Sequence, residues 1–109
     1  MLIDFNKEKS RVFTNMNGGG GNIFAKMFMF TSGKFITCKI EPGASIGLHE
    51  HTCTSDINFV ISGEGVAICN DVKEILTPGV CHFCPSGSSH AIYNTGTQDL
   101  VLYTVVVNI

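Results

Sequence analysis

The apolar positions of this chain fall into short runs that are separated by turn-forming residues. The runs cover residues 11–14, 23–30, 35–40, 56–61, 66–69, 72–76, 80–84, 90–94 and 100–107. Clusters of Gly, Pro, Asn, Asp and Ser stand between them, and no segment shows the repeat of an amphipathic helix. The pattern predicts eight or more short strands, which is typical of an all-β sandwich or barrel.

Two of these runs are apolar on both faces if they are strands, namely residues 23–30 (IFAKMFMF) and residues 100–107 (LVLYTVVV). Such strands are buried inside a sandwich or covered by a partner chain, because they would promote aggregation if left exposed. We therefore expect a homodimer with its interface along one sheet, although burial within the monomer would also explain the pattern.

Turn signals define several connections. Asn70-Asp71 stands between two apolar runs and predicts a tight two-residue hairpin. Residues 31–34 (TSGK) are predicted to form a turn. The glycine-rich run over residues 17–22 lacks the helix and the Lys-Ser/Thr pair of a phosphate loop, so it is interpreted as a flexible connector between strands.

The candidate chemistry centres on histidines. His49 and His51 are two residues apart, so a strand would place both imidazoles on one face. Asp56 lies an odd number of residues beyond His51, and a turn or bulge over residues 52–55 would be needed to reset its direction. His90 is a fourth candidate in a second Gly/Pro-rich stretch. Imidazoles and a carboxylate that face one space are suitable ligands for a divalent transition metal.

These residues resemble the two motifs of the cupin family. The first motif, G-x5-H-x-H-x3,4-E-x6-G, spans residues 43–63, and the second, G-x5-P-x-G-x2-H-x3-N, spans residues 79–94. Nine of the ten specified positions match, with fifteen residues between the motifs. The matching residues are Gly43, His49, His51, Gly63, Gly79, Pro85, Gly87, His90 and Asn94. Asp56 is the one departure, because the family usually has Glu there.

The resemblance implies a double-stranded β-helix, or jelly roll, formed by residues 1–109 as a single domain. It also implies a metal site of His49, His51, Asp56 and His90, filled by Fe, Mn, Zn, Ni, Co or Cu. Asp is one methylene shorter than Glu, so Asp56 ligates after a small backbone shift, binds through a water, or leaves a three-histidine site like that of thiol dioxygenases. A thiolate from Cys53 is a less favoured alternative.

Charge and cysteine content limit the possible partners and location. The net charge of −2 gives no support for nucleic-acid binding, and no apolar run is long enough to span a membrane. Five cysteines without an apolar leader favour a cytoplasmic protein with reduced thiols. Neither motif contains Lys or Arg. A phosphorylated substrate is therefore disfavoured unless Arg11, Lys26 or Lys39 reaches the site.

Few other groups are suited to acid–base chemistry. Strand parity directs Glu50 away from the metal, and Cys81 and Cys84 are three residues apart, which favours packing over a zinc site. His82 is expected to support the site or the core, and Asn58, Tyr93 and Tyr103 are weak bases. The resemblance implies a metal-dependent enzyme for a small molecule but does not select among oxygenase, isomerase and lyase chemistry. A dioxygenase is favoured over an isomerase or a lyase because an open metal position suffices and no strong base is evident. The alternative is a non-catalytic module that binds a small molecule or a sugar.

Overall fold

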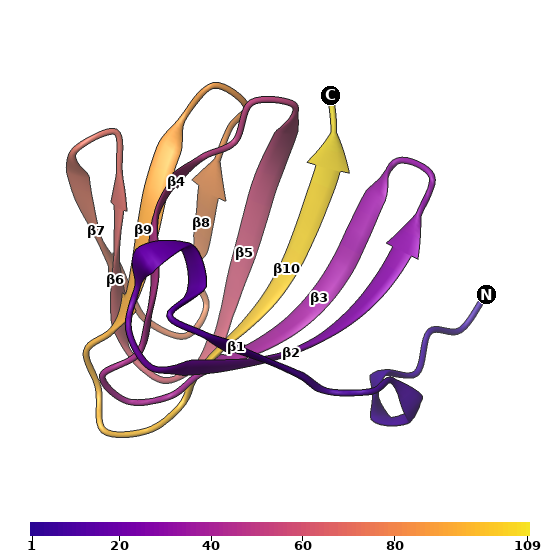
Figure 1. Ribbon diagram of the computed structural model, residues 1–109, viewed down its shortest axis with the longest axis horizontal. Helices are drawn as coiled ribbons and strands as arrows, with labels where there is room; N and C mark the ends of the chain where they lie inside the picture. The colour runs from indigo at the N-terminus through magenta and orange to yellow at the C-terminus, as the bar shows by residue number, and fades with distance from the viewer.

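The computed structural model describes residues 1–109, and the chain is built almost entirely from strands (Figure 1). The strands are β1 Arg11–Thr14, β2 Asn22–Phe30, β3 Gly33–Ile40, β4 Ser45–Glu50, β5 Thr54–Ser62, β6 Gly65–Cys69, β7 Val72–Leu76, β8 Cys81–Cys84, β9 Ser89–Asn94 and β10 Leu100–Asn108. Two short 3-10 turns, η1 Phe5–Lys7 and η2 Met16–Gly18, complete the secondary structure. Neither is long or apolar enough to cross a membrane.

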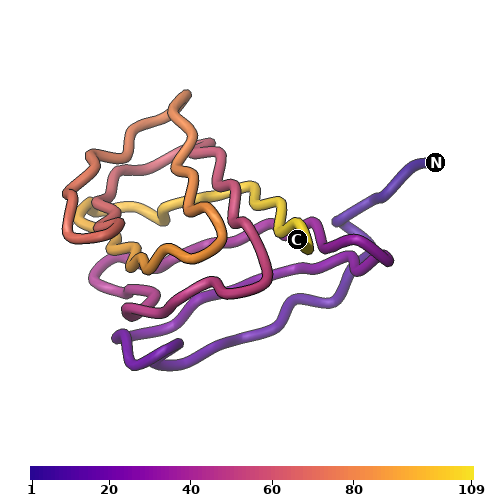
Figure 2. Tube along the Cα trace, turned by 90° about the horizontal axis from the view of Figure 1, so that it is seen from above, coloured from indigo at the N-terminus to yellow at the C-terminus, as the bar shows by residue number.

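The strands form two antiparallel sheets, which confirms the predicted jelly roll. One sheet has the order β1-β2-β3-β10-β5-β8 and the other the order β4-β9-β6-β7. Figure 1 shows the strands bending around a common interior, and Figure 2 shows the N-terminal strands on one flank with the segment around β7 and β8 on the other. Consecutive strands β4 and β5 belong to different sheets, so the chain crosses the sandwich between Glu50 and Thr54.

The hydrophobic core lies between the two sheets. Along β10 every second residue is buried, beginning at Leu100 and ending at Val106, as the two-residue period of a strand requires. The core combines residues from both sheets with Ala44 of the connection between β3 and β4: Ile23, Cys38, Ile40, Ala44, Val60, Ala67, Leu76, Ile92, Leu100 and Leu102. Truncating a buried leucine of this kind to alanine costs about 2–5 kcal/mol of stability. This packing fixes the inner faces from which the site residues project.

The predicted hairpin at Asn70-Asp71 is confirmed, because β6 and β7 pair directly on either side of it. Both residues have positive φ angles, 47° and 65°, as a two-residue turn matched to the strand twist requires. The predicted turn over residues 31–34 is shorter than expected. Strand β3 already begins at Gly33, so Lys34 is a strand residue that pairs with Met29 and Val106.

The glycine loop, residues 17–22, joins β1 to β2 as expected, but it is anchored rather than flexible. The Ser45 main-chain N–H donates to the Gly20 carbonyl at 2.8 Å, and the Gly20 N–H donates to the Ser45 hydroxyl oxygen at 3.0 Å. A Cβ atom on Gly19 would lie 2.3 Å from the Ser45 carbonyl oxygen, which no side chain tolerates. The glycines therefore let this loop pack directly on the backbone of β4.

Candidate metal centre and its cavity

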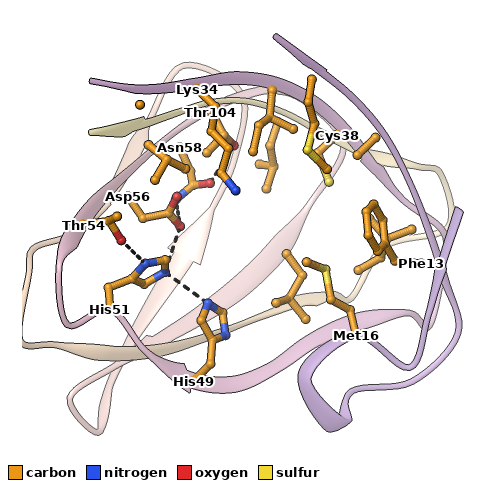
Figure 3. A pocket seen from close by; sticks show the side chains of 18 of the residues that line it. Phe13, Met16, Lys34, Cys38, His49, His51, Thr54, Asp56, Asn58 and Thr104 are labelled. Carbon is orange, nitrogen blue, oxygen red and sulfur yellow. Dashed lines mark hydrogen bonds and ion pairs between the residues drawn. The ribbon is translucent and has the colours of Figure 1, made fainter. Parts of the chain in front are cut away.

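Three histidines, His49, His51 and His90, converge on one point inside the sandwich. Figure 3 shows two of them, His49 and His51, with their rings directed toward each other. His49 lies in β4 and pairs across the sheet with His90 of β9, whereas His51 follows the last residue of β4. The Nε2 atoms of His49, His51 and His90 form a triangle with sides of 3.1 Å. The structure thus brings together the three histidines that the motifs indicated.

Hydrogen bonds to the opposite ring nitrogens orient these imidazoles. The Nδ1 of His49 lies 2.7 Å from the Gly47 carbonyl oxygen, and the Nδ1 of His51 lies 2.9 Å from the Thr54 hydroxyl. A carbonyl oxygen only accepts, so Nδ1 of His49 carries the proton and donates. In the neutral ring its Nε2 is then a free lone pair that faces the other two histidines.

The third histidine is oriented by a pair of residues that the metal motifs do not include. His90 Nδ1 lies 2.8 Å from His82 Nε2, and His82 Nδ1 lies 2.9 Å from Glu74 Oε1. The Glu74 carboxylate accepts from His82 Nδ1, so a neutral His82 accepts from His90 Nδ1–H. His90 then presents an Nε2 lone pair to the centre. The expected supporting role of His82 is therefore confirmed by its contacts.

Asp56 approaches the same point from the opposite sheet. Its Oδ2 atom lies 3.2 Å from His90 Nε2 and 3.6 Å from His51 Nε2, and it accepts a hydrogen bond from Asn58 Nδ2 at 3.1 Å. Asn58 is itself held by the Thr104 hydroxyl, which donates to its Oδ1 at 2.7 Å. Asp56 faces the histidines because the chain has crossed to the other sheet, so parity within a single strand does not apply.

The surroundings lower the pKa of two members of this cluster, Asp56 and His51. Burial raises the pKa of the Asp56 carboxyl, but the approach of His90 Nε2, the hydrogen bond from Asn58 and the charge that His90 and His51 would carry if protonated outweigh it, so the pKa lies below its usual value. Burial is also the main cause that lowers the pKa of His51, and it outweighs the opposing charge of Asp56. The result is a carboxylate at Asp56 beside an imidazole at His51 that favours its neutral form.

The donor set fits a metal ion. Nitrogen ligands bind zinc at about 2.1 Å, so two of them are about 3.0 Å apart at a right angle and about 3.4 Å apart at a tetrahedral angle. The observed spacing of 3.1 Å is nearer to the right-angled arrangement. Facing lone pairs and a carboxylate oxygen repel one another unless a proton or a cation lies between them. The three histidines form a group in which every ligand atom lies within 4.8 Å of every other. Asp56 is not part of that group, although its Oδ2 atom is close to His90 and His51.

The histidines open into a cavity of about 490 Å³. Its walls are mostly apolar and come from β2, β3, β10 and the segment that leads into the glycine loop, with Phe13, Met16, Met27, Ile36, Cys38 and Val106 among the lining residues. Lys34, Asp56, Asn58 and Thr104 add polar groups on the wall that faces the histidines (Figure 3). The cavity has the size and lining of a small-molecule site.

Several other candidates lie away from this cavity. Cys53, Cys81 and Glu50 are exposed and absent from the lining, and Cys84 is buried, so the two thiols of the Cys81/Cys84 pair point to opposite faces as expected. Cys81 therefore does not pack in the core. Tyr93 and Tyr103 are also exposed, so neither faces the histidines.

Sequence reasoning missed two groups at this site. Lys34 was assigned to a turn, although the alternation of positions 34, 36, 38 and 40 would have placed it on the inner face. Glu74 gave no signal, because its contact with His82 depends on the packing of one sheet against the other. The three lysines and arginines considered for the cavity, Arg11, Lys26 and Lys39, do not line it.

Comparisons with known proteins agree with this geometry. The family model described as "Cupin domain" matches residues 36–106. A protein of Thermotoga maritima named oxalate-binding protein is 35% identical over 100 residues, which cover 86% of this chain and 83% of that protein. A crystal structure from Thermotoga maritima, described as a predicted oxalate decarboxylase, has a TM-score of 0.94 at 30% identity. The match covers 100% of this chain and 100% of that chain.

A more distant structure, a Cupin 2 conserved barrel domain protein from Salinispora arenicola, has a TM-score of 0.77 at 18% identity. The match covers 99% of this chain and 88% of that chain, so the two proteins share the same fold. The family model, the relative at 35% identity and the shared jelly roll lead to one conclusion. This chain belongs to the cupin family.

Proposed function

We propose that this cupin binds a divalent transition metal ion through His49, His51 and His90, and that the filled site holds a small carboxylate ligand in the cavity. The observation that carries this proposal is the triangle of Nε2 atoms, each 3.1 Å from the others. Hydrogen bonds on the far side of the His49 and His90 rings leave lone pairs rather than protons to face the centre, and the Thr54 hydroxyl can accept from Nδ1 of His51 in the same way. Such outer contacts typically fix the tautomer of a metal-binding histidine.

Asp56 is proposed as the fourth ligand, either after a small shift of its carboxylate or through a bridging water. Its Oδ2 lies beside His90 and His51 but outside the group of donors within 4.8 Å of one another. Asn58 and Thr104 hold the carboxylate toward the histidines in either case. The bound ion would act as a Lewis acid that attracts an anionic oxygen of the ligand.

Oxalate is the first ligand to test. The Thermotoga maritima relative, 35% identical, is named an oxalate-binding protein. In this chain, Ile36 and Val106 contribute to the apolar walls of the cavity, and an apolar surrounding strengthens electrostatic contacts with a bound carboxylate. The Asn58 and Thr104 side chains are already committed to each other and to Asp56, so recognition of the ligand falls to the ion and to the remaining polar groups.

Binding is favoured over acid–base catalysis by the ionisable groups in the cavity. Apart from the histidines, these are Lys34, Cys38 and Asp56. Burial raises the pKa of the Cys38 thiol to about 12, and the pKa of Asp56 is lowered, so neither is tuned to exchange protons at neutral pH. A dioxygenase, which needs only a redox-active ion, is therefore the second candidate, ahead of an isomerase or a lyase.

The test begins with metal analysis of protein purified without added metal, followed by calorimetric titration with oxalate. We expect a bound transition metal and saturable oxalate binding that disappears when the metal is removed. His51→Ala should lose most of the metal and the oxalate binding, whereas Cys81→Ala, at an exposed position, should retain both. Equal metal loss in the two variants would refute the ligand assignment. Dioxygen uptake with any screened substrate would favour the oxygenase.

We also propose a homodimer that forms through the outer face of the six-stranded sheet. Tyr103 of β10 pairs across the sheet with Phe59 of β5, and both side chains are about half exposed, at 50% and 47%. Phe83 at 51% and Ile61 at 45% lie on the neighbouring β8 and on β5. Exposed aromatic residues gathered on one sheet are typical of an interface.

All five cysteines are free thiols, which supports a reducing, cytoplasmic location.

A further inference from the structure

Lys34 is the one lysine or arginine on the wall of the cavity. In the register of the sheet Lys34 pairs with Val106, and Val106 pairs with Asp56 on its other side. Lys34 and Asp56 therefore stand in the same row and on the same inner face, one strand apart. Because neighbouring strands are about 4.8 Å apart, their Cα atoms are separated by about 10 Å. Figure 3 shows the Lys34 side chain directed into the cavity from the wall that carries Thr104 and Asn58.

The ammonium group of Lys34 has no carboxylate partner in the protein. The ion pairs of the structure join Asp56 to His51 and His90, and Glu74 to His82. Lys34 is half-buried, and its neighbours across the strands are Met29 and Val106. A charge turned toward an apolar interior without a counter-ion is unfavourable. An anion supplied by a ligand would remove that cost.

The charges of the filled site indicate which anion fits best. A divalent ion, the Asp56 carboxylate and the Lys34 ammonium together leave two positive charges, because the ligand histidines are neutral when they bind a metal. Without Lys34 only one would remain. In a cavity with apolar walls an uncompensated charge is costly, so Lys34 changes the matching ligand from a monoanion to a dianion.

We propose that Lys34 is the second anchor of the ligand, and that the ligand is a short dicarboxylate with one carboxylate at the three histidines and the other at the Lys34 ammonium. This role rests on the proposed metal-dependent binding of a carboxylate. A dicarboxylate fits better than a phosphate, because a phosphate group requires several converging cations or backbone N–H donors, and Lys34 is a single point charge.

The test compares Lys34→Met with two reference variants, all loaded with the metal found in the wild-type protein. Lys39→Met removes a lysine from the exposed face of the same strand, and Lys34→Arg retains the charge at the cavity. Metal content, thermal unfolding and calorimetric affinities for oxalate, malonate, succinate, acetate and inorganic phosphate are measured for each. The dicarboxylate series reports the distance between the two anchors.

We expect Lys34→Met to fold, to retain its metal and to bind the preferred dicarboxylate about 10- to 100-fold more weakly, as for the loss of a hydrogen bond to a charged group. The affinity for acetate should change by less than about threefold, since acetate needs only the first anchor. Lys39→Met should match the wild type, and Lys34→Arg should recover most of the affinity.

Three results would overturn the role of Lys34 alone: unchanged dicarboxylate affinity in Lys34→Met, an equal loss for acetate and dicarboxylates, or tighter wild-type binding of inorganic phosphate than of any dicarboxylate. Failure of the metal-loaded wild-type protein to bind any carboxylate would instead overturn the proposed function, and the role of Lys34 with it. The two failures are distinguishable because the second is visible before any variant is made.

Discussion

Replacing His82 by phenylalanine should weaken metal binding although His82 is not a ligand. His82 is 1% exposed, accepts from His90 Nδ1–H at 2.8 Å and donates to Glu74 at 2.9 Å. Phenylalanine keeps a ring of similar shape but offers no acceptor. The Nδ1–H of His90, which is also 1% exposed, would then have no partner. His90 could recover a hydrogen bond only by turning its ring away from the direction in which Nε2 faces the other histidines.

The expected size of the effect follows from this contact. A buried N–H without a partner costs about 1–3 kcal/mol. Loss of such an outer contact typically reduces metal affinity about 10- to 100-fold, which corresponds to about 1.4–2.8 kcal/mol. The two ranges agree because both describe the loss of one hydrogen bond, the one between His90 and His82. Glu74→Gln is the matched control, since its amide oxygen still accepts from His82 and its side chain is 40% exposed. We expect it to lose less than about threefold in affinity.

Competition with a chromophoric chelator at fixed pH measures these affinities, and circular dichroism reports whether each variant is folded. A folded His82→Phe protein that binds metal within twofold of the wild type would refute a positioning role for His82. A loss in Glu74→Gln as large as that in His82→Phe would show that the carboxylate charge, rather than the hydrogen bond to His90, sets the affinity.

Three further predictions concern pH, thiol reactivity and assembly. Because burial lowers the pKa of His51, its neutral form persists below pH 6.5. Metal analysis after dialysis should therefore find the ion retained at pH 6.5 and released only in more acidic buffer. Release of the ion already at pH 7 would contradict this reasoning. Burial raises the pKa of Cys38 to about 12, so a thiol reagent at pH 8 should label the exposed Cys53 and Cys81 rapidly and leave Cys38 unmodified, as peptide mass mapping would show. Phe59→Lys should shift the sedimentation coefficient from dimer to monomer without unfolding the chain, and a wild-type protein that is monomeric at micromolar concentration would exclude the dimer.

The strands were predictable wherever a turn had a local chemical cause. Asn70 and Asp71 tolerate positive φ angles, so the hairpin between β6 and β7 could be placed from two residues. The two motifs likewise indicated the three histidines. The fold brings them together because His49 of β4 and His90 of β9 form a cross-strand pair.

What could not be predicted depends on contacts between segments that are distant in sequence. The direction of Asp56 was judged from its parity with His51, but the two residues approach the site from different sheets. Glu74 reaches His82 from the second sheet, and no local pattern encodes that contact. Lys34 was misplaced for a smaller reason, since the turn after Phe30 is two residues shorter than its composition suggested.

The glycine loop has a consequence for which part of the chain forms the cavity wall. The conserved-domain match covers residues 36–106, yet Phe13, Met16, Asn17 and Met27 outside that range form part of the cavity wall. The loop can lie there only because Gly47 on β4 also lacks a side chain, since a Cβ atom on it would lie 2.1 Å from the Asn17 carbonyl oxygen. The shape of the cavity thus depends in part on an N-terminal arm that carries none of the three histidines. A shortened version that begins at residue 36 would keep the three histidines and lose one side of the chamber.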